Sequence, residues 1–159
     1  VFKTSSGAVG SKIMNSGIPL QGLLSIVSRN HYIFLSKKSK DLGLTGRQFP
    51  CLILLSHKPG ITQDDIANTF QIDKGSVARS VKKLEDDEFI HRIPDPKNRR
   101  KYLLFLTKKG EKVIPEVKTI EQEWEKMVCE GLEESEKVKL REFMTLLAKN
   151  SIDKLKKQN

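Results

Sequence analysis

Two short helical segments, joined by a tight turn and followed at once by a basic stretch, constrain the fold of this chain most. The first helix is expected after Thr62, whose hydroxyl suits an N-cap, with Asp65 three residues later as a partial capping box. The second is expected after Asp73, another N-cap residue. Helical spacing selects the side chains that face the core, which are Ile66, Ala67, Phe70, Val77, Val81 and Leu84. Two short helices joined in this way predict a helix-turn-helix.

The period of the sequence then changes from helical to strand-like. Residues 89–93 and 101–106 are β-prone, and residues 94–100 between them combine prolines with basic and turn-forming side chains. This arrangement predicts a hairpin whose tip carries positive charge. A helix-turn-helix followed by a basic hairpin is the order of elements in a winged helix.

Further helices are predicted on both sides of this motif. A helix over 18–41 has two apolar stripes, so it buries more than one face and can meet another subunit. Thr45 is expected to cap the next helix, and Thr107 a long helix that Pro115 either bends or breaks after its first turn. A last helix runs from about 133, and its inward side chains are predicted to be Leu140, Phe143, Met144, Leu147, Ile152 and Leu155. The predicted fold class is therefore mainly α with a small β-hairpin.

Length and composition limit the class of protein. At 159 residues the chain suits one domain over 18–159, preceded by a Ser- and Gly-rich stretch at 1–17 that is predicted as a flexible arm or a remnant of expression. No apolar run approaches the roughly 18 residues of a membrane span, and we expect no secretory signal. Two distant cysteines do not make a disulfide framework, so a reducing cytoplasm is the expected location.

The placement of charge indicates a polyanionic partner. The chain has 29 Lys and Arg against 20 Asp and Glu, which gives a formal net charge of +9. Between residues 91 and 109 the sequence has several basic residues and a single acidic one, Asp95. A local basic patch of this kind suits nucleic acid, although a solvated, solubilising face would have the same composition.

The outward face of the second helix of the motif is polar and basic. Opposite its core positions lie Lys74, Ser76, Arg79, Ser80 and Lys83, with Gly75 near the helix start. A helix about 10–12 Å across fits the major groove of B-DNA, where an arginine can hydrogen-bond guanine with two donors. The lysines suit phosphates, and Thr62 and Gln63, at the start of the preceding helix, are placed to touch the DNA backbone. The alternative is an ordinary amphipathic helix with a polar outer face.

The predicted hairpin tip adds three consecutive cations, Arg99, Arg100 and Lys101. Arginine inserted into a narrow minor groove gains from the enhanced negative potential there. Asp95 is expected to pair with Arg99 or Arg100 and so to aim its guanidinium. These cations predict a minor-groove contact, and a soluble loop is the alternative.

These stretches resemble the MarR (multiple antibiotic resistance regulator) family of winged-helix transcription factors. The resemblance covers about residues 18–157, and its most specific part is the hairpin with the Leu-Thr-x-x-Gly that follows it. The matching stretches are 61–67, 73–85, 90–100 and 106–110. The resemblance implies a homodimer, with a recognition helix in the major groove and a wing in the minor groove.

The same resemblance divides the chain by role. Residues 45–110 would form the DNA-binding lobe, and residues 18–41 and 111–157 would form dimerisation helices. The chain departs from the family pattern at two positions. Asn98 stands where the family often has Asp before the paired arginines, and Glu88 stands where the family often has Gly before the first wing strand.

The family also implies a small, often phenolic or anionic, effector bound between the dimer helices and the winged helix. Binding there would change the spacing of the two recognition helices. Arg29, His31 and Tyr32 are the polar and aromatic residues of the right kind near that junction, with packing or surface solvation as the alternative for each. No cofactor is expected, and no metal, because the cysteines and histidines lack paired ligand spacing.

Other function classes have less support from the residues. An enzyme is not expected, because the histidines are scattered and no nucleophile elbow, phosphate loop or His-Glu-x-x-His motif occurs. A thiol redox sensor of the same fold would use Cys51, which better suits core packing, or Cys129, which is expected to be exposed near a helix end. A winged helix used only for protein contacts would have little use for cations at its hairpin tip. The sequence thus predicts a sequence-specific regulator, more readily a repressor than an activator, that binds pseudo-palindromic duplex DNA as a homodimer.

Overall fold

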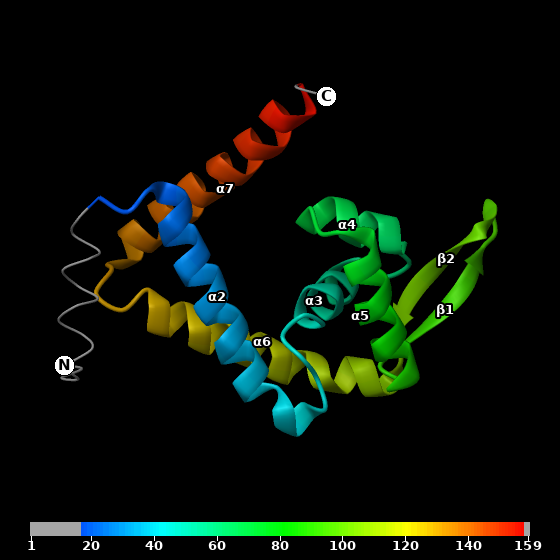
Figure 1. The fold of residues 1–159 in the computed structure, drawn as a ribbon. Coiled ribbons are helices and arrows are strands. Elements are labelled where there is room, and N and C mark those ends of the chain that lie inside the picture. The colour runs from blue at the N-terminus through cyan, green and yellow to red at the C-terminus, as the bar shows by residue number, and fades with distance from the viewer. Residues whose placement is uncertain (1–16, 158–159) are drawn as a thin grey trace. The chain divides into compact units, whose positions relative to one another are not determined.

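The computed structural model describes residues 17–157, so the predicted arm lies outside the described residues except for Gly17. Its helices and strands, shown in Figure 1, follow in chain order: α2 (Leu20–Lys38), the 3-10 turn η1 (Lys40–Leu42), α3 (Phe49–His57), α4 (Gln63–Phe70), α5 (Lys74–Asp86), β1 (Ile90–Asp95), β2 (Asn98–Leu106), α6 (Lys108–Val128) and α7 (Glu134–Lys156). The predicted fold class, mainly helical with one antiparallel hairpin, is confirmed.

The chain divides into two compact units, and the division falls inside α6, after Glu121. The first unit contains α2 to β2 and most of α6. Each of these elements contributes to one apolar core, with η1 adding only the partly buried Leu42. The least exposed members of this core are Phe49, Leu52, Leu55, Ile66, Val81, Leu84, Ile90, Leu104 and Val117. The second unit contains the end of α6 and α7. The lobe boundaries inferred from the family resemblance stay a prediction.

The helix-turn-helix forms where the sequence places its caps. The Thr62 hydroxyl accepts from the Asp65 amide at 3.2 Å, and the Asp65 carboxylate accepts from the Thr62 amide at 2.8 Å, so the capping box is complete. Gln71 makes the turn with a left-handed φ of 51°, the conformation that glycine often supplies. Phe70 is 40% exposed, so its predicted core position is wrong. It is the last residue of α4, and the chain reverses immediately after it, beyond the edge of the core.

The start of α3 also differs from the prediction. Thr45 does not cap this helix, which begins four residues later at Phe49. Instead, the Thr45 amide and hydroxyl both donate to the side-chain oxygen of the buried Gln48, at 2.7 and 3.0 Å. Pro50 explains the later start, because proline lacks an amide proton and is best placed in the first turn of a helix.

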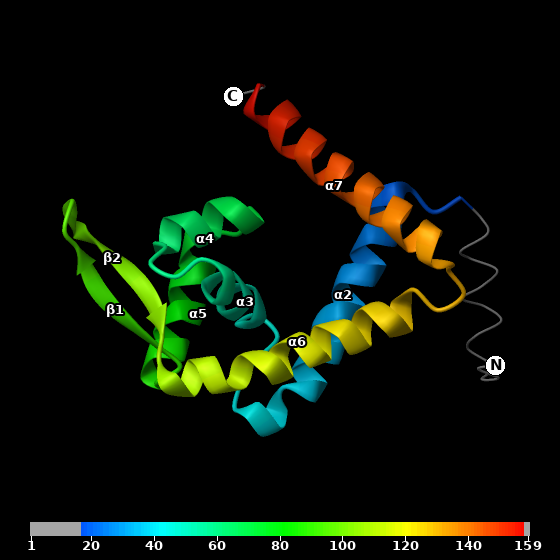
Figure 2. The same ribbon diagram turned by 180° about the vertical axis from the view of Figure 1, so that it is seen from behind.

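The hairpin is longer than the sequence pattern predicted. Its register pairs Ile90 with Leu106 and Pro94 with Tyr102, and an irregularity lies between Pro94 and Asp95. The predicted loop at 94–100 is therefore mostly strand, and only 96–97 form the turn between β1 and β2. The ladder continues outward because the Asp95 carboxylate accepts the Lys97 amide at 2.8 Å and tightens the turn. Figures 1 and 2 show the hairpin projecting away from α3, α4 and α5.

A short bridge ties the hairpin to the helix-turn-helix. Ile61, just before α4, pairs with Leu104 of β2. The Leu104 amide donates to the Ile61 carbonyl at 2.9 Å, and the Gly60 amide donates to the Leu104 carbonyl at 2.9 Å. The base of β2 is thus fixed beside the start of α4.

The end of the hairpin is joined to α6 by a close backbone approach and by hydrogen bonds of Thr107. The Thr107 hydroxyl donates to the Glu88 carbonyl at 2.6 Å and accepts from the Gly110 amide at 3.1 Å. The Thr107 amide donates to the Phe89 carbonyl at 3.0 Å. A Cβ atom on Gly110 would lie 2.0 Å from that same Phe89 carbonyl oxygen. The Leu-Thr-x-x-Gly stretch therefore has a structural cause, since threonine caps the helix and only glycine permits this approach.

The backbone at the junction before β1 shows why glycine is favoured at position 88, where this chain has Glu. Glu88 has a φ of 62°, in the left-handed region that favours glycine. The fold is kept although this residue has a Cβ atom, and the strain is local to the turn between α5 and β1.

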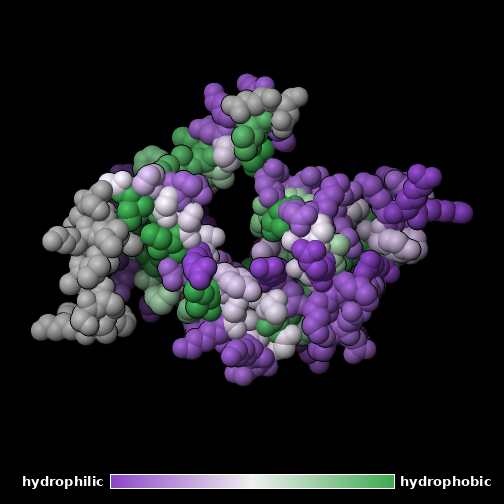
Figure 3. All heavy atoms as spheres, in the orientation of Figure 1, coloured by the Kyte–Doolittle hydropathy of each residue, from purple (hydrophilic) through white to green (hydrophobic). Residues whose placement is uncertain are grey.

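The two long helices at the end of the chain also differ in part from the predictions. Helix α6 continues through Pro115, so the predicted break does not occur. Helix α7 forms as expected, but it has no buried residue, and Leu140, Phe143, Met144 and Leu147 are at least 38% exposed. Figure 3 shows hydrophobic residues along α7. Their predicted inward position is wrong for the single chain, in which these side chains are exposed.

We expect Gly110→Ala to lower the free energy of unfolding by about 3 kcal/mol, because the new methyl group overlaps a backbone carbonyl that cannot swing aside. Denaturant unfolding followed by circular dichroism measures this change. The control is Lys112→Ala on the exposed side of the same helix, which we expect to change stability by no more than about 0.5 kcal/mol. Equal stability of the two variants would contradict the close approach.

We expect Glu88→Gly to raise the free energy of unfolding by about 0.5–1 kcal/mol, since glycine relieves the left-handed strain but gains entropy in the unfolded chain. Glu88→Ala removes the same carboxylate and keeps the Cβ atom, so it should not stabilise the protein. Thermal unfolding of both variants separates backbone strain from charge, and a stabilising alanine would refute the strain argument.

Candidate nucleic-acid interface

Helix α5 presents the predicted outward face. Its side chains Val77, Val81 and Leu84 are buried in the core, which fixes the rotation of the helix. On the opposite face the side chains of Lys74, Arg79 and Lys83 are 74%, 73% and 60% exposed. Gly75, Ser76 and Ser80 lie between them and are half-buried. All six residues predicted on this helix therefore share one accessible surface.

The arginine of this face is held along the helix. Its guanidinium donates to the Ser76 hydroxyl at 2.9 Å and lies 3.9 Å from the Asp73 carboxylate. Asp73 also accepts the amides of Gly75 and Ser76, at 3.1 and 2.7 Å, as the N-cap of α5. These hydrogen bonds, chiefly those from Ser76, lower the pKa of the Asp73 carboxyl below its usual range. The cap thus both begins the helix and restrains Arg79.

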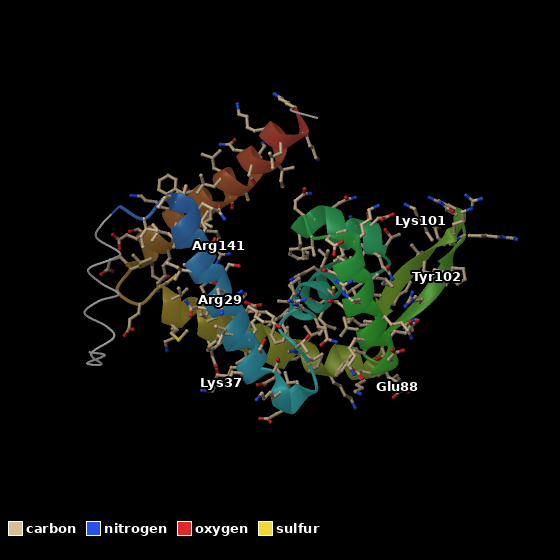
Figure 4. The ribbon with its side chains drawn as sticks, viewed as in Figure 1. Arg29, Lys37, Glu88, Lys101, Tyr102 and Arg141 are labelled. Carbon is tan, nitrogen blue, oxygen red and sulfur yellow. The ribbon has the colours of Figure 1, made fainter. Side chains whose placement is uncertain are left out.

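The start of α4 lies beside the hairpin. Thr62 and Gln63 are half-buried, and with Arg92, Arg100 and Tyr102 they line a hollow of about 200 Å³ to which Asp64 and Lys101 also contribute. The Thr62 hydroxyl is already engaged, because it donates to Asp65 at 2.8 Å. Hydrogen bonds from the Thr62 amide and hydroxyl lower the pKa of Asp65. Figure 4 shows Lys101 and Tyr102 on β2.

The wing cations differ in place and partner from the prediction. Arg99, Arg100 and Lys101 belong to β2 rather than to a loop, and all three are exposed. Asp95 does not pair with either arginine in the part of the chain that the structure describes, since its carboxylate caps the turn at Lys97 instead. The short loop brings the Lys97 amide within reach first. Both arginines thus remain available to a ligand.

Two residues of this surface were missed by the sequence analysis. Arg92, on β1, forms an ion pair with Glu85 at the end of α5 and links the hairpin to that helix. Asp64, the second residue of α4, accepts from Lys74 at 2.9 Å and lies 3.3 Å from Lys101. Strand alternation could have placed Arg92 on the core side of β1, but no sequence pattern relates Asp64 to residues ten and 37 positions away.

The three predicted effector residues are in separate environments. His31 Nε2 lies 2.9 Å from Glu121 Oε2 of α6. The Tyr32 ring is covered by the Arg47 guanidinium, whose carbon lies 5.5 Å from the ring centroid. Arg29 is exposed on α2, where Figure 4 labels it. The structure explains His31 and Tyr32 by contacts within the first unit.

Both cysteines are buried. Cys51 packs in the core as predicted, and burial raises the pKa of its thiol to about 11. Cys129 is only 8% exposed, so its predicted exposure is wrong. Because the thiolate is the reactive form, the buried Cys51 with its raised pKa is poorly suited to sense oxidants. Over residues 17–157, no group of three or more potential metal ligands occurs and no helix is long and apolar enough to cross a membrane.

Comparison with known proteins identifies the family. Residues 44–102 match the model of the MarR family. The regulator YybA of Bacillus subtilis, named as a helix-turn-helix transcriptional regulator, is 33% identical over 111 residues, which cover 70% of this chain and 74% of the relative. The regulator BilQ of Clostridium symbiosum is 37% identical over 115 residues, which cover 72% and 75%. The chain belongs to the MarR family.

Solved structures agree with this assignment. A MarR transcriptional regulator from Methanosarcina mazei has a TM-score of 0.79 and 31% identity, with 82% of this chain and 94% of that chain covered. A MarR-family protein of Listeria monocytogenes in complex with a 26mer DNA has a TM-score of 0.82 and 22% identity, covers 87% and 92%, and supports the fold. As a MarR-family protein, the chain is a DNA-binding transcriptional regulator with a winged-helix fold.

We expect Asp73→Ala to lower the melting temperature at pH 7 by roughly 2–4 °C, because the first amides of α5 lose their acceptor. The lowered pKa means that the stabilisation is present above the ordinary Asp pKa of about 3.9 and is lost as pH falls through the folded-state value. The gap between wild type and variant should therefore close in acid. Asp73→Asn keeps an acceptor and is the control, and a gap that persists at pH 2 would contradict the cap.

Proposed function

We propose that this MarR-family protein is a repressor that binds pseudo-palindromic duplex DNA as a homodimer and is released by a small-molecule effector. The observation that carries the proposal is the fixed pairing of two cationic elements in one unit. Helix α5 presents an exposed basic face, and the hairpin beside it presents Arg99 and Arg100. Figure 3 shows hydrophilic residues over the hairpin.

The residues would divide into base-reading and phosphate-binding groups. Arg79 is the candidate for guanine, because an exposed guanidinium can donate two hydrogen bonds to one base edge in the major groove. The hydroxyls of Ser76 and Ser80 can donate or accept beside it. Phosphate and backbone contacts are assigned to Thr62, Gln63, Lys74, Gly75, Lys83 and Lys101. Arg99 and Arg100 are assigned to the minor groove, and Asp95 keeps the turn between the strands closed.

The exposed apolar side chains of the outer helices support a homodimer. Leu20, Val27 and Ile33 of α2 are 56%, 46% and 51% exposed, and Phe143 of α7 is 62% exposed. Large apolar surfaces of this kind on a protein mark association sites. We assign residues 18–41 and 111–157 to this association and residues 45–110 to DNA binding. A dimer would place two copies of α5 at successive major grooves, about 34–36 Å apart.

The proposed effector release involves α2, which lies outside the proposed DNA contacts. Arg29, His31 and Tyr32 remain its candidates for a phenolic or anionic ligand, and they would act through α2. The ion pair of His31 with Glu121 joins α2 to α6, so a ligand that breaks it would loosen the connection between these helices. A ligand shifts the dimer only by its difference in affinity for the two arrangements.

The deciding experiment selects bound duplexes from a random pool and reads the half-site spacing. Binding to the selected site is then compared for two variants. Arg99→Ala with Arg100→Ala should weaken binding to every sequence. Arg79→Ala should cost about 1–3 kcal/mol at a single base position and little at mismatched sites. Equal effects of Arg79→Ala on matched and mismatched sites would remove it from base reading.

Salt dependence and the oligomeric state provide the controls. A dimer with about 6–10 phosphate contacts should lose roughly 10³–10⁵ in affinity between 50 and 200 mM salt. A protein that binds no duplex at 50 mM salt, or that is monomeric at the binding concentrations, would refute the proposal.

A further inference from the structure

One carboxylate on the proposed DNA-binding surface is shared by two lysines from different elements. Asp64, in the first turn of α4, lies 2.9 Å from Lys74 Nζ at the start of α5 and 3.3 Å from Lys101 Nζ on β2. Its two oxygens are divided between them, with Oδ1 facing Lys74 and Oδ2 facing Lys101. Three elements of the winged helix therefore meet at one negative charge.

This carboxylate is charged at neutral pH and reachable by solvent. Hydrogen bonds from Lys74 and then Lys101 lower the pKa of Asp64. The side chains of Asp64, Lys74 and Lys101 are 38%, 74% and 45% exposed. Exposed ion pairs of this kind contribute little to stability and are screened by salt.

The capping box of α4 does not use Asp64. Its neighbour Asp65 forms both hydrogen bonds of the capping box with Thr62, so the helix start is already satisfied. Asp64 therefore places a negative charge where a phosphate chain would approach Thr62 and Gln63, without a structural need for it at the cap. The ion-pair partners of Asp64 are Lys74 and Lys101.

We propose that Asp64 is an internal competitor for DNA phosphates, which occupies Lys74 and Lys101 and weakens binding to duplex of any sequence. The inference rests on the proposed DNA contacts of these two lysines. When a duplex binds, phosphates replace Asp64 as the partners of the lysines, but the carboxylate stays at the interface and cancels about one positive charge per protomer. Phosphate contacts dominate non-specific binding, so this charge limits the time spent on competing sites.

The test is Asp64→Asn in the full chain, which keeps the size of the side chain and removes its charge. Binding to a mixed-sequence duplex is measured by fluorescence anisotropy from 50 to 200 mM NaCl. The variant should bind more tightly at 50 mM, and its plot of log affinity against log salt should be steeper by about 0.9 per bound protomer. Its advantage over wild type should thus fall roughly 3.5-fold per protomer across this range.

A charge-matched control separates this local effect from net charge. Asp86→Asn removes the same charge from an ion pair with Lys82, at the last residue of α5 and away from Lys74 and Lys101. We expect its salt slope to equal that of wild type. A second arm adds Lys101→Gln, which should weaken binding more in the Asp64→Asn background than in wild type, because only there is Lys101 fully available.

Each outcome decides between the alternatives. Unchanged or weaker binding by Asp64→Asn would overturn the inference, and weaker binding would make Asp64 a positioning residue for the lysines. An equal change of slope in Asp86→Asn would also overturn it, since net charge would then suffice. These results require a wild type that binds duplex, so a wild type that fails to bind refutes the proposed function instead. Matching circular dichroism spectra and melting temperatures confirm that the variants are folded.

Discussion

The winged helix depends on one close backbone approach, between Gly110 of α6 and the carbonyl of Phe89 just before β1. That carbonyl also accepts the Thr107 amide, and the Thr107 hydroxyl closes the loop to Glu88. The end of α5, both ends of the hairpin and the start of α6 are thereby fixed within a few residues. Because the hairpin has only two strands, its direction relative to α5 depends on this junction, on the bridge from Ile61 and on the ion pair of Arg92.

A second constraint is electrostatic: it depends on which cations of the surface are paired with a carboxylate. The lysines of α5 have internal partners, as Lys74 has in Asp64 and Lys83 has in Asp87. The arginines nearest the hairpin tip have none among the residues that the structure describes, because Asp95 is used by the turn. The surface therefore has two kinds of cation. The lysines are paired with carboxylates, which a phosphate would have to displace, whereas Arg99 and Arg100 are available to a ligand. In the proposed complex, this difference would favour first contact at Arg99 and Arg100, which have no ion pair to break among the described residues, unlike Lys101 and Arg92 of the same hairpin.

The sequence predicts what local chemistry determines. Thr62 with Asp65, and Asp73, predicted the start of both helices of the motif, and the spacing of Val77, Val81 and Leu84 predicted the orientation of α5. Several predictions were wrong where a residue's state depends on more than its local pattern. Phe70 fits the helical pattern but lies past the core, and Cys129 fits an exposed helix end but is buried. The loop predicted at 94–100 became strand because ladder hydrogen bonds outweigh the local preference of prolines and asparagine. Asp64 has no local signature, since its partners are on two other elements.

The two units differ in how completely a single chain buries their apolar side chains. In the first unit the core residues of α3, α5 and β2 reach full burial, so the DNA-binding surface has a rigid support without a partner. In α7 no residue is buried, although its sequence repeats apolar side chains at helical spacing. Propensity alone rarely stabilises a helix in water, and tertiary packing supplies most of the remainder. In the proposed homodimer, the order of α7 would depend on association, whereas the core that supports α5 and the hairpin is already buried in the single chain. Association would then set the distance between two surfaces that are each already formed.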